Sequence, residues 1–200
     1  EDLTIAESSG YLLLPAKGTP LLLTDFRYRQ QAEDEASGFE VHLYRKGLIA
    51  LLTEMLPRMA VQRFAFEGHY FLHDKALQLQ KTLAKAGIEC VSLAGVIEEM
   101  RAVKTEEELE LIARSVHLNE QVFQEVRSGL RPGLTEKEVA WRIETILRQK
   151  GAERASFPPI VAGGANGALP HAEPGDRPLQ SGEPIIIDMG LVKDGYCSDM

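Results

Sequence analysis

The 200-residue sequence contains few cysteines and no excess of positive charge. Its two cysteines, Cys90 and Cys197, are too few for a disulfide framework and favour a reducing compartment, so we expect a cytoplasmic protein. The formal net charge is -8 at pH 7, and no basic stripe is available to neutralise phosphates, which excludes a typical nucleic-acid binder. No apolar run approaches the length needed to cross a bilayer, so no membrane partner is expected.

The composition is that of an ordinary globular protein, with 44% hydrophobic and 26% charged residues. In the first half, short apolar runs alternate with helical patterns, which favours an α/β domain with a mixed sheet. Pro57 is expected to end the second of its helices. The expected elements are strands at 11–15 and 20–24 (a hairpin), 39–44, 61–67 and 88–93, and helices at 27–36, 46–56 and 74–87.

The second half begins with two longer helical patterns, each opened by a capping box, Thr105 to Glu108 and Thr135 to Glu138. Residues 153–183 are rich in Gly, Pro and Ala and are expected to form a long loop region. One apolar face is expected on each helix, made of Leu109, Ile112, Val116, Phe123 and Val126 on the first and Val139, Ile143, Ile146 and Leu147 on the second.

The closing segment PIIIDMGLVKDGYCSDM places two carboxylates, Asp188 and Asp199, in an apolar strand pattern. Asp194-Gly195 is a strong signal for a two-residue hairpin turn. Side chains alternate faces with a period of two, so any even loop keeps both aspartates on one face. With Asp194-Gly195 as the loop, Gly190 lies opposite Asp199. A loop at Lys193-Asp194 instead places the aspartates directly opposite each other.

Two converging carboxylates repel each other unless a cation lies between them. Hard divalent cations such as Mn²⁺ prefer oxygen ligands, which makes this face a candidate metal site. The alternative is that Asp188 ends its strand and Asp199 caps a turn. Spacing alone does not decide between the two interpretations.

Residues 156–200 resemble the signature region of the pita-bread metallopeptidases, the family of aminopeptidase P, Xaa-Pro dipeptidase (prolidase) and methionine aminopeptidase. The matching pieces are IVAGGANGALPH, the Asp-x-Gly of IIIDMG, and GYCSDM. Residues 98–115 resemble the opening of that family's catalytic domain, and residues 11–32 resemble the smaller N-terminal domain of its proline-specific branch. The resemblance implies a creatinase/prolidase-like α/β domain at 1–97, incomplete at its start, followed at 98–200 by the start of an α+β pita-bread catalytic domain.

Carried over to this sequence, the resemblance assigns Asp188 and Asp199 as the first two ligands of a dinuclear metal centre, with Asp199 bridging both ions. Mn²⁺ or Co²⁺ is the expected metal, with Zn²⁺ and Fe²⁺ as alternatives. A bridging water or hydroxide would attack the scissile carbonyl. His171 matches a catalytic and substrate-binding histidine that contacts the substrate or stabilises the tetrahedral intermediate.

The family's centre needs one His and two Glu more, from later in the chain, and none of them can be assigned before Met200. We therefore expect this sequence to be part of a longer peptidase and to be inactive by itself, because two carboxylates make a poor metal site. Relatives of this kind are often homodimers, so a homodimer is expected.

The activity that the resemblance implies is metal-dependent hydrolysis of Xaa-Pro bonds in proline-containing dipeptides or peptides, of the prolidase or the aminopeptidase P type. One alternative is the creatinase-like branch, which uses the same fold without metals. Another is a catalytically dead pita-bread protein that serves as a protein-binding module. Asp188 and Asp199 are both present, which weighs against each alternative.

Overall fold

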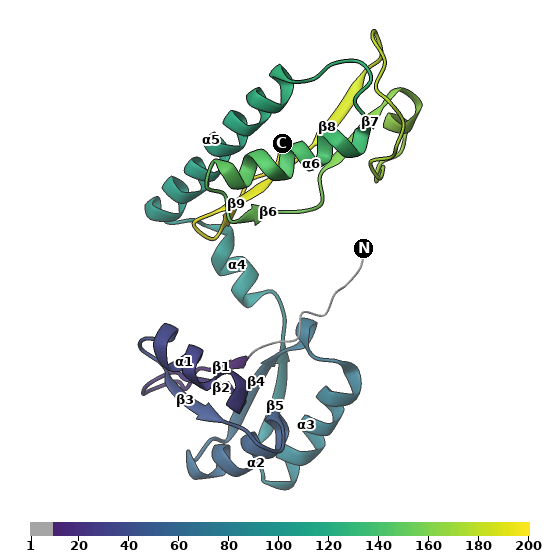
Figure 1. Ribbon diagram of the computed structural model, residues 1–200. Helices are drawn as coiled ribbons and strands as arrows, with labels where there is room; N and C mark the ends of the chain where they lie inside the picture. Colours follow the sequence, from purple (N-terminus) through teal and green to yellow (C-terminus); the bar gives the residue numbers. More distant parts are fainter. Residues whose placement is uncertain (1–9) are drawn as a thin grey trace. The chain divides into compact units, whose positions relative to one another are not determined.

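The computed structural model describes residues 10–200, which form two compact units, one ending at Glu99 and the other running from Met100 to Met200. Each unit combines short strands with helices packed against them (Figure 1). Within the described residues, no helix combines the length and the apolar character that a bilayer-crossing segment needs.

The first unit contains a mixed sheet, as expected. The hairpin strands β1 and β2 pair antiparallel and β3 joins β2 in parallel, whereas β4 and β5 form a separate parallel pair. Its elements are β1 (Gly10–Leu13), β2 (Leu21–Thr24), η1 (Phe26–Tyr28), α1 (Arg29–Glu35), β3 (Glu40–Leu43), α2 (Leu48–Arg58), β4 (Arg63–Glu67), η2 (Gly68–Tyr70), α3 (His73–Lys85) and β5 (Glu89–Leu93).

The core of this unit is apolar, and leucines of α2 and α3 meet leucines of the sheet there. The expectation that Pro57 ends α2 is wrong, because the helix continues to Arg58. Proline lacks the N–H that would bond the carbonyl four residues earlier in a helix. Pro57 lies in the last turn of α2, so the helix loses this one hydrogen bond and still reaches Arg58. The fully buried leucines at this core are Leu23, Leu56, Leu79 and Leu83.

The second unit is built from two long helices, a three-stranded antiparallel sheet of order β10-β9-β6, and the antiparallel pair β7-β8. The helices α5 and α6 lie against one another and against the strands (Figure 1). Helix α4 (Val96–Ala102) contains the boundary between the two units. The elements that follow it are α5 (Glu106–Ser128), α6 (Glu136–Gln149), β6 (Arg154–Ala155), β7 (Ile160–Gly163), η3 (Gly164–Ala168), β8 (Ile185–Asp188), β9 (Leu191–Lys193) and β10 (Tyr196–Cys197).

Both capping boxes are confirmed, since each threonine bonds the glutamate's backbone N–H and each glutamate bonds back to the threonine's N–H. The apolar face of α6 is confirmed as well. That of α5 is confirmed only in part, because Val126 is fully buried and Phe123 packs against the core, whereas Leu109 is 49% exposed and Val116 is 40% exposed. Beside Val126, α5 buries Ser115, Asn119 and Val122, none of which was expected there.

The loop expected at 153–183 contains two strands that the sequence interpretation missed, the short β6, which pairs with β9, and β7. β7 pairs with β8 along its whole length, with Ile160 opposite Asp188 and Gly163 opposite Ile185. Two prolines precede β7 and two glycines end it, so its short apolar run resembles loop sequence. Partner strand β8 supplies the backbone hydrogen bonds that stabilise it.

Candidate active site

The candidate site is organised by the hairpin that closes the chain. β9 turns into β10 through Asp194-Gly195, whose φ angles of 51° and 77° are those of a two-residue type I′ turn. Lys193 pairs with Tyr196 in the resulting ladder. The register expected for an Asp194-Gly195 loop is confirmed, and the alternative loop at Lys193-Asp194 is wrong.

This register continues beyond β9 and β10 to the two aspartates. The backbones of Met189 and Met200 exchange two hydrogen bonds of 3.0 Å, and Ser198 N–H donates to the Leu191 carbonyl at 2.9 Å. Gly190 therefore lies opposite Asp199, as expected. Because Asp188 is two residues from Gly190, strand alternation places both aspartates on one face.

That face is the one turned away from the helices. Met189 and Leu191 are fully buried in the apolar cluster that α5 and α6 form with the strands. The intervening positions of the two strands, and with them both aspartates, take the opposite face. Cys197, two residues from Asp199, belongs to this face too and is exposed.

Within residues 10–200 neither aspartate side chain forms a hydrogen bond or an ion pair. Asp188 is half-buried at the end of β8, and Asp199 is exposed. The donor chemistry fits a divalent cation in kind, because two unengaged carboxylates on one face offer hard oxygen ligands. Two carboxylates are too few ligands for a complete metal site, and no group of three or more His, Cys, Asp or Glu side chains in the described part of the chain could hold a metal ion.

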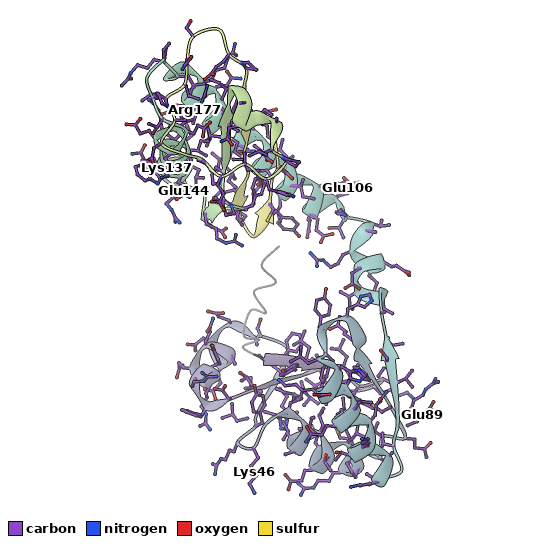
Figure 2. The ribbon with its side chains drawn as sticks, turned by 90° about the vertical axis from the view of Figure 1, so that its right-hand side faces the viewer. Lys46, Glu89, Glu106, Lys137, Glu144 and Arg177 are labelled. Atoms are coloured by element: carbon purple, nitrogen blue, oxygen red, sulfur yellow. The ribbon has the colours of Figure 1, made fainter. Side chains whose placement is uncertain are left out.

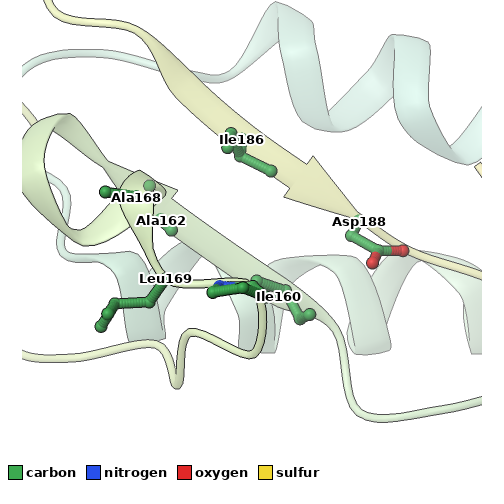
Figure 3. Close-up of a pocket in the computed structure, with 8 residues that line it drawn as sticks. Ile160, Ala162, Ala168, Leu169, Ile186 and Asp188 are labelled. Carbon is green, nitrogen blue, oxygen red and sulfur yellow. The ribbon is translucent and has the colours of Figure 1, made fainter.

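A pocket of about 290 Å³ lies beside Asp188. Figure 3 shows Asp188 at the end of β8, with Ile186 further back on the same strand and Ile160 on β7. Leu169 and Pro170 form another part of the wall, and they immediately precede His171. Asp188 and the residues just before His171 therefore line the same pocket. His171 itself is exposed, and neither it nor Asp199 lines the pocket.

The backbone between β8 and β9 is fixed by polar side chains of α5. Asn119 Nδ2 donates to the Met189 carbonyl and Ser115 Oγ to the Leu191 carbonyl, both at 3.3 Å. These two polar residues share the buried face of α5 with Val122 and Val126. Their spacing of four residues on a helix was the available signal, but their partners lie 70 or more residues away in the sequence.

Gly190 is required by close approach of the backbone. A Cβ atom there would lie 2.2 Å from the Ser198 carbonyl oxygen and 2.2 Å from Ser156 Oγ. Ser156 Oγ itself donates to that carbonyl at 3.1 Å. The glycine of the Asp-x-Gly motif therefore lets β9 and the Asp199 strand pack without a side chain between them.

Two carboxylates, neither of which the sequence interpretation identified, bond the connection between β7 and β8 that carries His171, one from within it and one from α6. Arg177 forms a bidentate pair with Glu183, one contact being 2.9 Å from Nη1 to Oε1. The hydrogen bonds from Arg177 hold the pKa of Glu183 below its ordinary value. The second carboxylate, Glu136 at the start of α6, is 1% exposed and accepts hydrogen bonds from this segment.

Two family models match the chain. Residues 4–103 match the creatinase/prolidase N-terminal domain, and residues 110–200 match metallopeptidase family M24. The uncharacterized peptidase YqhT of Bacillus subtilis is 30% identical over 178 residues, which are 89% of this chain and 50% of that protein.

Solved structures of similar proteins share this fold. An X-Pro aminopeptidase from Thermotoga maritima is 31% identical with a TM-score of 0.82, and the match covers 95% of this chain and 53% of that one. An Xaa-Pro dipeptidase from Bacillus anthracis is 29% identical with a TM-score of 0.85, and the match covers 96% and 53%. The chain spans about half the length of these relatives. By its two domain matches, the chain belongs to the pita-bread metallopeptidases of family M24 and carries their creatinase/prolidase N-terminal domain.

Proposed function

We propose that the protein containing this chain hydrolyses Xaa-Pro peptide bonds and uses two divalent metal ions to do so. The observation that carries the proposal is the strand register, which puts Asp188 and Asp199 on one face away from the helices, with neither carboxylate engaged by another side chain. The substrate class is supported by two structural neighbours, which are described as an X-Pro aminopeptidase and an Xaa-Pro dipeptidase.

In this proposal Asp188 and Asp199 are residues that would hold the metal ions. The remaining ligands, one His and two Glu in the family resemblance, would come from outside residues 10–200. Mn²⁺ or Co²⁺ is the proposed metal, because oxygen-rich sites suit such ions. When bound, such ions supply Lewis-acid chemistry and lower the pKa of water at the site.

His171 is the proposed catalytic and substrate-binding histidine. Its segment shares the pocket wall with Asp188 through Leu169 and Pro170. An exposed imidazole at this position can donate a hydrogen bond to the carbonyl oxygen of the scissile bond. Such a donor stabilises the negative charge that develops on that oxygen during attack.

The test combines metal analysis with hydrolysis of an Xaa-Pro dipeptide and an Xaa-Pro tripeptide by the full-length protein. We expect chelation to abolish hydrolysis and added Mn²⁺ or Co²⁺ to restore it. Asp199→Asn should lower both metal content and kcat/KM, the latter by at least about 100-fold, since even residues that only support metal ligands contribute 10- to 100-fold. Asp194→Asn is the matched control, because it makes the same chemical change in the same hairpin and asparagine suits the turn.

Each alternative predicts a different result. Hydrolysis that survives complete chelation would contradict the metal mechanism and favour a creatinase-like enzyme. Metal-loaded protein that hydrolyses neither peptide would contradict the peptidase function and favour a protein-binding module. Full activity of Asp199→Asn would remove Asp199 from the mechanism. The ratio of dipeptide to tripeptide hydrolysis distinguishes a prolidase from an aminopeptidase P.

A homodimer is also part of the proposal, and it rests on the resemblance alone. Light scattering on the purified full-length protein should give twice the mass of one chain. A monomer mass across the concentration range of the activity assay would contradict it.

A further inference from the structure

Glu136 is unusual because it is a carboxylate in the interior of the second unit. It is 1% exposed, and it is the charged member of the buried polar residues that the structure describes. Burying a carboxylate is unfavourable unless hydrogen bonds and opposite charge compensate for the lost water. The partners of Glu136 therefore indicate what the residue does.

Three donors surround the carboxylate. Oε1 accepts from Gly163 N–H at 2.8 Å, at the end of β7. Oε2 accepts from Asn166 Nδ2 at 2.9 Å and from Gly175 N–H at 3.0 Å. Gly163 ends β7, and Asn166 and Gly175 belong to the connection between β7 and β8, so one side chain of α6 holds the end of β7 and the following connection at three points.

The two contacts of Oε2 enclose the candidate histidine. Asn166 and Gly175 are the ends of a segment that contains Leu169 and Pro170 of the pocket wall and then His171. Because one oxygen atom binds both ends, the ends are held together and the segment is closed into a loop. The backbone of α6 adds a further tie, since Lys137 N–H donates to the Gly175 carbonyl at 3.1 Å.

Charge favours the same arrangement. Glu136 is the first residue of α6, where the free N–H groups of a helix favour a negative side chain. Arg177 supplies a positive charge nearby, and its pKa is raised by hydrogen bonds to Glu183 and, to a smaller extent, by attraction to Glu183 and Glu136. The helix start and Arg177 thus compensate the negative charge of the buried Glu136 carboxylate.

We propose that Glu136 is a positioning residue that fixes His171 by closing the 166–175 segment against the start of α6. This role rests on the proposed function, in which His171 contacts the substrate. Glu136 acts through the backbone of the segment and does not touch the reacting atoms.

The test variant is Glu136→Gln, which keeps the shape of the side chain. Its amide has one acceptor oxygen, so its NH₂ group must face either Gly163 N–H or the donors of Asn166 and Gly175. At least one of the three hydrogen bonds is lost in either orientation. Glu144→Gln is the matched control, because Glu144 is an exposed glutamate of the same helix and lies on the outside of the unit (Figure 2).

The first readout needs no catalysis. In Glu136→Gln we expect amide exchange to accelerate by at least about tenfold at Gly163 or at Gly175, whichever N–H the glutamine NH₂ group faces, since a lost hydrogen bond lowers the free energy of local opening. The imidazole NMR signals of His171 should broaden or split, because the loop samples more than one position. Glu144→Gln should leave both the amide exchange rates and the His171 signals unchanged. Unchanged exchange and unchanged His171 signals in Glu136→Gln would overturn the proposal.

The second readout is hydrolysis of an Xaa-Pro dipeptide by the full-length protein. Glu136→Gln should lower kcat by about 10- to 100-fold with a smaller change in KM, as expected for a misplaced catalytic group. In a His171→Ala background the same substitution should have no further effect, because both changes act through one group. Losses that multiply in the double variant would show that Glu136 acts independently of His171 and would overturn the proposal.

Asn166→Ala is the substitute variant if Glu136→Gln does not fold. It frees one end of the 166–175 segment and leaves Glu136 with two hydrogen-bond donors. It should broaden the His171 signals in the same way but less strongly, and unchanged signals would count against the proposal. A wild-type protein that hydrolyses no Xaa-Pro peptide would refute the proposed function. The exchange and NMR results would still decide whether Glu136 holds the segment.

Discussion

The two units of the chain bury different kinds of side chain. The core of the first unit is apolar, and Thr24 is the buried polar residue among those described there. The second unit has an apolar cluster of its own, but it also encloses several polar groups. Those buried polar residues are Ser115, Asn119, Glu136 and Ser198.

The buried polar groups of the second unit have a common role, because all four bond to the backbone beside candidate site residues. Ser115, Asn119 and Ser198 bond the backbone between Met189 and Leu191, and Glu136 bonds the connection that carries His171. Apolar burial is non-directional and stabilises a fold without fixing where a particular strand end lies. Hydrogen bonds are directional, so the unit that carries the candidate site uses them to place its backbone.

The largest expected difference between the units comes from replacing a buried side chain by methionine. Glu136→Met leaves Gly163 N–H and Gly175 N–H without an acceptor, whereas Asn166 Nδ2 keeps its longer contact of 3.5 Å with the Glu173 carbonyl. Each buried unpaired group costs about 1–3 kcal/mol, so we expect the free energy of unfolding of the second unit to fall by at least about 2 kcal/mol. Leu83→Met in the first unit should cost less than about 1.5 kcal/mol, because shape and polarity are nearly kept.

Urea unfolding, with hydrogen exchange to assign each transition to its unit, measures both changes. Equal losses in the two variants would mean that the buried polar contacts of the second unit contribute no more than apolar packing does. The distinction between the units would then fail.

A smaller difference is expected when a methyl group is added to a close-packed glycine. In Gly190→Ala the new Cβ would lie 2.2 Å from the Ser198 carbonyl, a backbone atom held in the hairpin. In Gly68→Ala of the first unit the Cβ would lie 2.1 Å from Ser92 Oγ, which can rotate away. We expect Gly190→Ala to lower the free energy of unfolding by about 2 kcal/mol and Gly68→Ala by about 0.5 kcal/mol or less.

Thermal and urea unfolding of both variants check this expectation. A cost of Gly68→Ala as large as that of Gly190→Ala would show that the first unit is as rigid at this position as the hairpin. The Asp194-Gly195 turn should survive in Gly190→Ala, so its amide exchange serves as a test that the fold is kept.

Features that depend on neighbouring residues could be predicted from the sequence. The Asp194-Gly195 turn fixes the hairpin register because both residues tolerate positive φ. The capping boxes begin α5 and α6 because their donors and acceptors lie three residues apart. The register in turn predicted that Asp188 and Asp199 share a face, while their metal-binding role stays a prediction.

Features that depend on distant partners were missed. An apolar face was expected on α5, yet it buries Ser115 because a backbone carbonyl 76 residues away accepts its hydrogen bond. Glu136 resembled an ordinary first-turn glutamate, since nothing local reveals that Gly163 and Gly175 will approach it. β7 was read as loop because its pairing partner β8 follows much later in the chain.

The smallest expected effect concerns Glu108, which joins the start of α5 to β10. Its Oε2 accepts from Thr105 N–H at 2.8 Å, and its Oε1 accepts from Tyr196 OH at 3.2 Å. The backbone hydrogen bond from Thr105 is the main cause that lowers the pKa of Glu108 below its ordinary value of 4.5, and the Tyr196 hydroxyl adds to it.

A carboxylate with a lowered pKa in the folded state stabilises the fold above its ordinary pKa and loses that contribution as pH falls through the folded value. The stability difference between wild type and Glu108→Gln should therefore be largest near neutral pH and should shrink below about pH 4.5. Tyr196→Phe should keep most of this pH dependence, because the Thr105 bond remains. Urea midpoints between pH 3 and pH 7 measure all three proteins. If Tyr196→Phe abolished the pH dependence as fully as Glu108→Gln, the long-range bond from Glu108 to β10 would contribute more than the local cap, and the second unit would depend on a distant polar contact at this point as well.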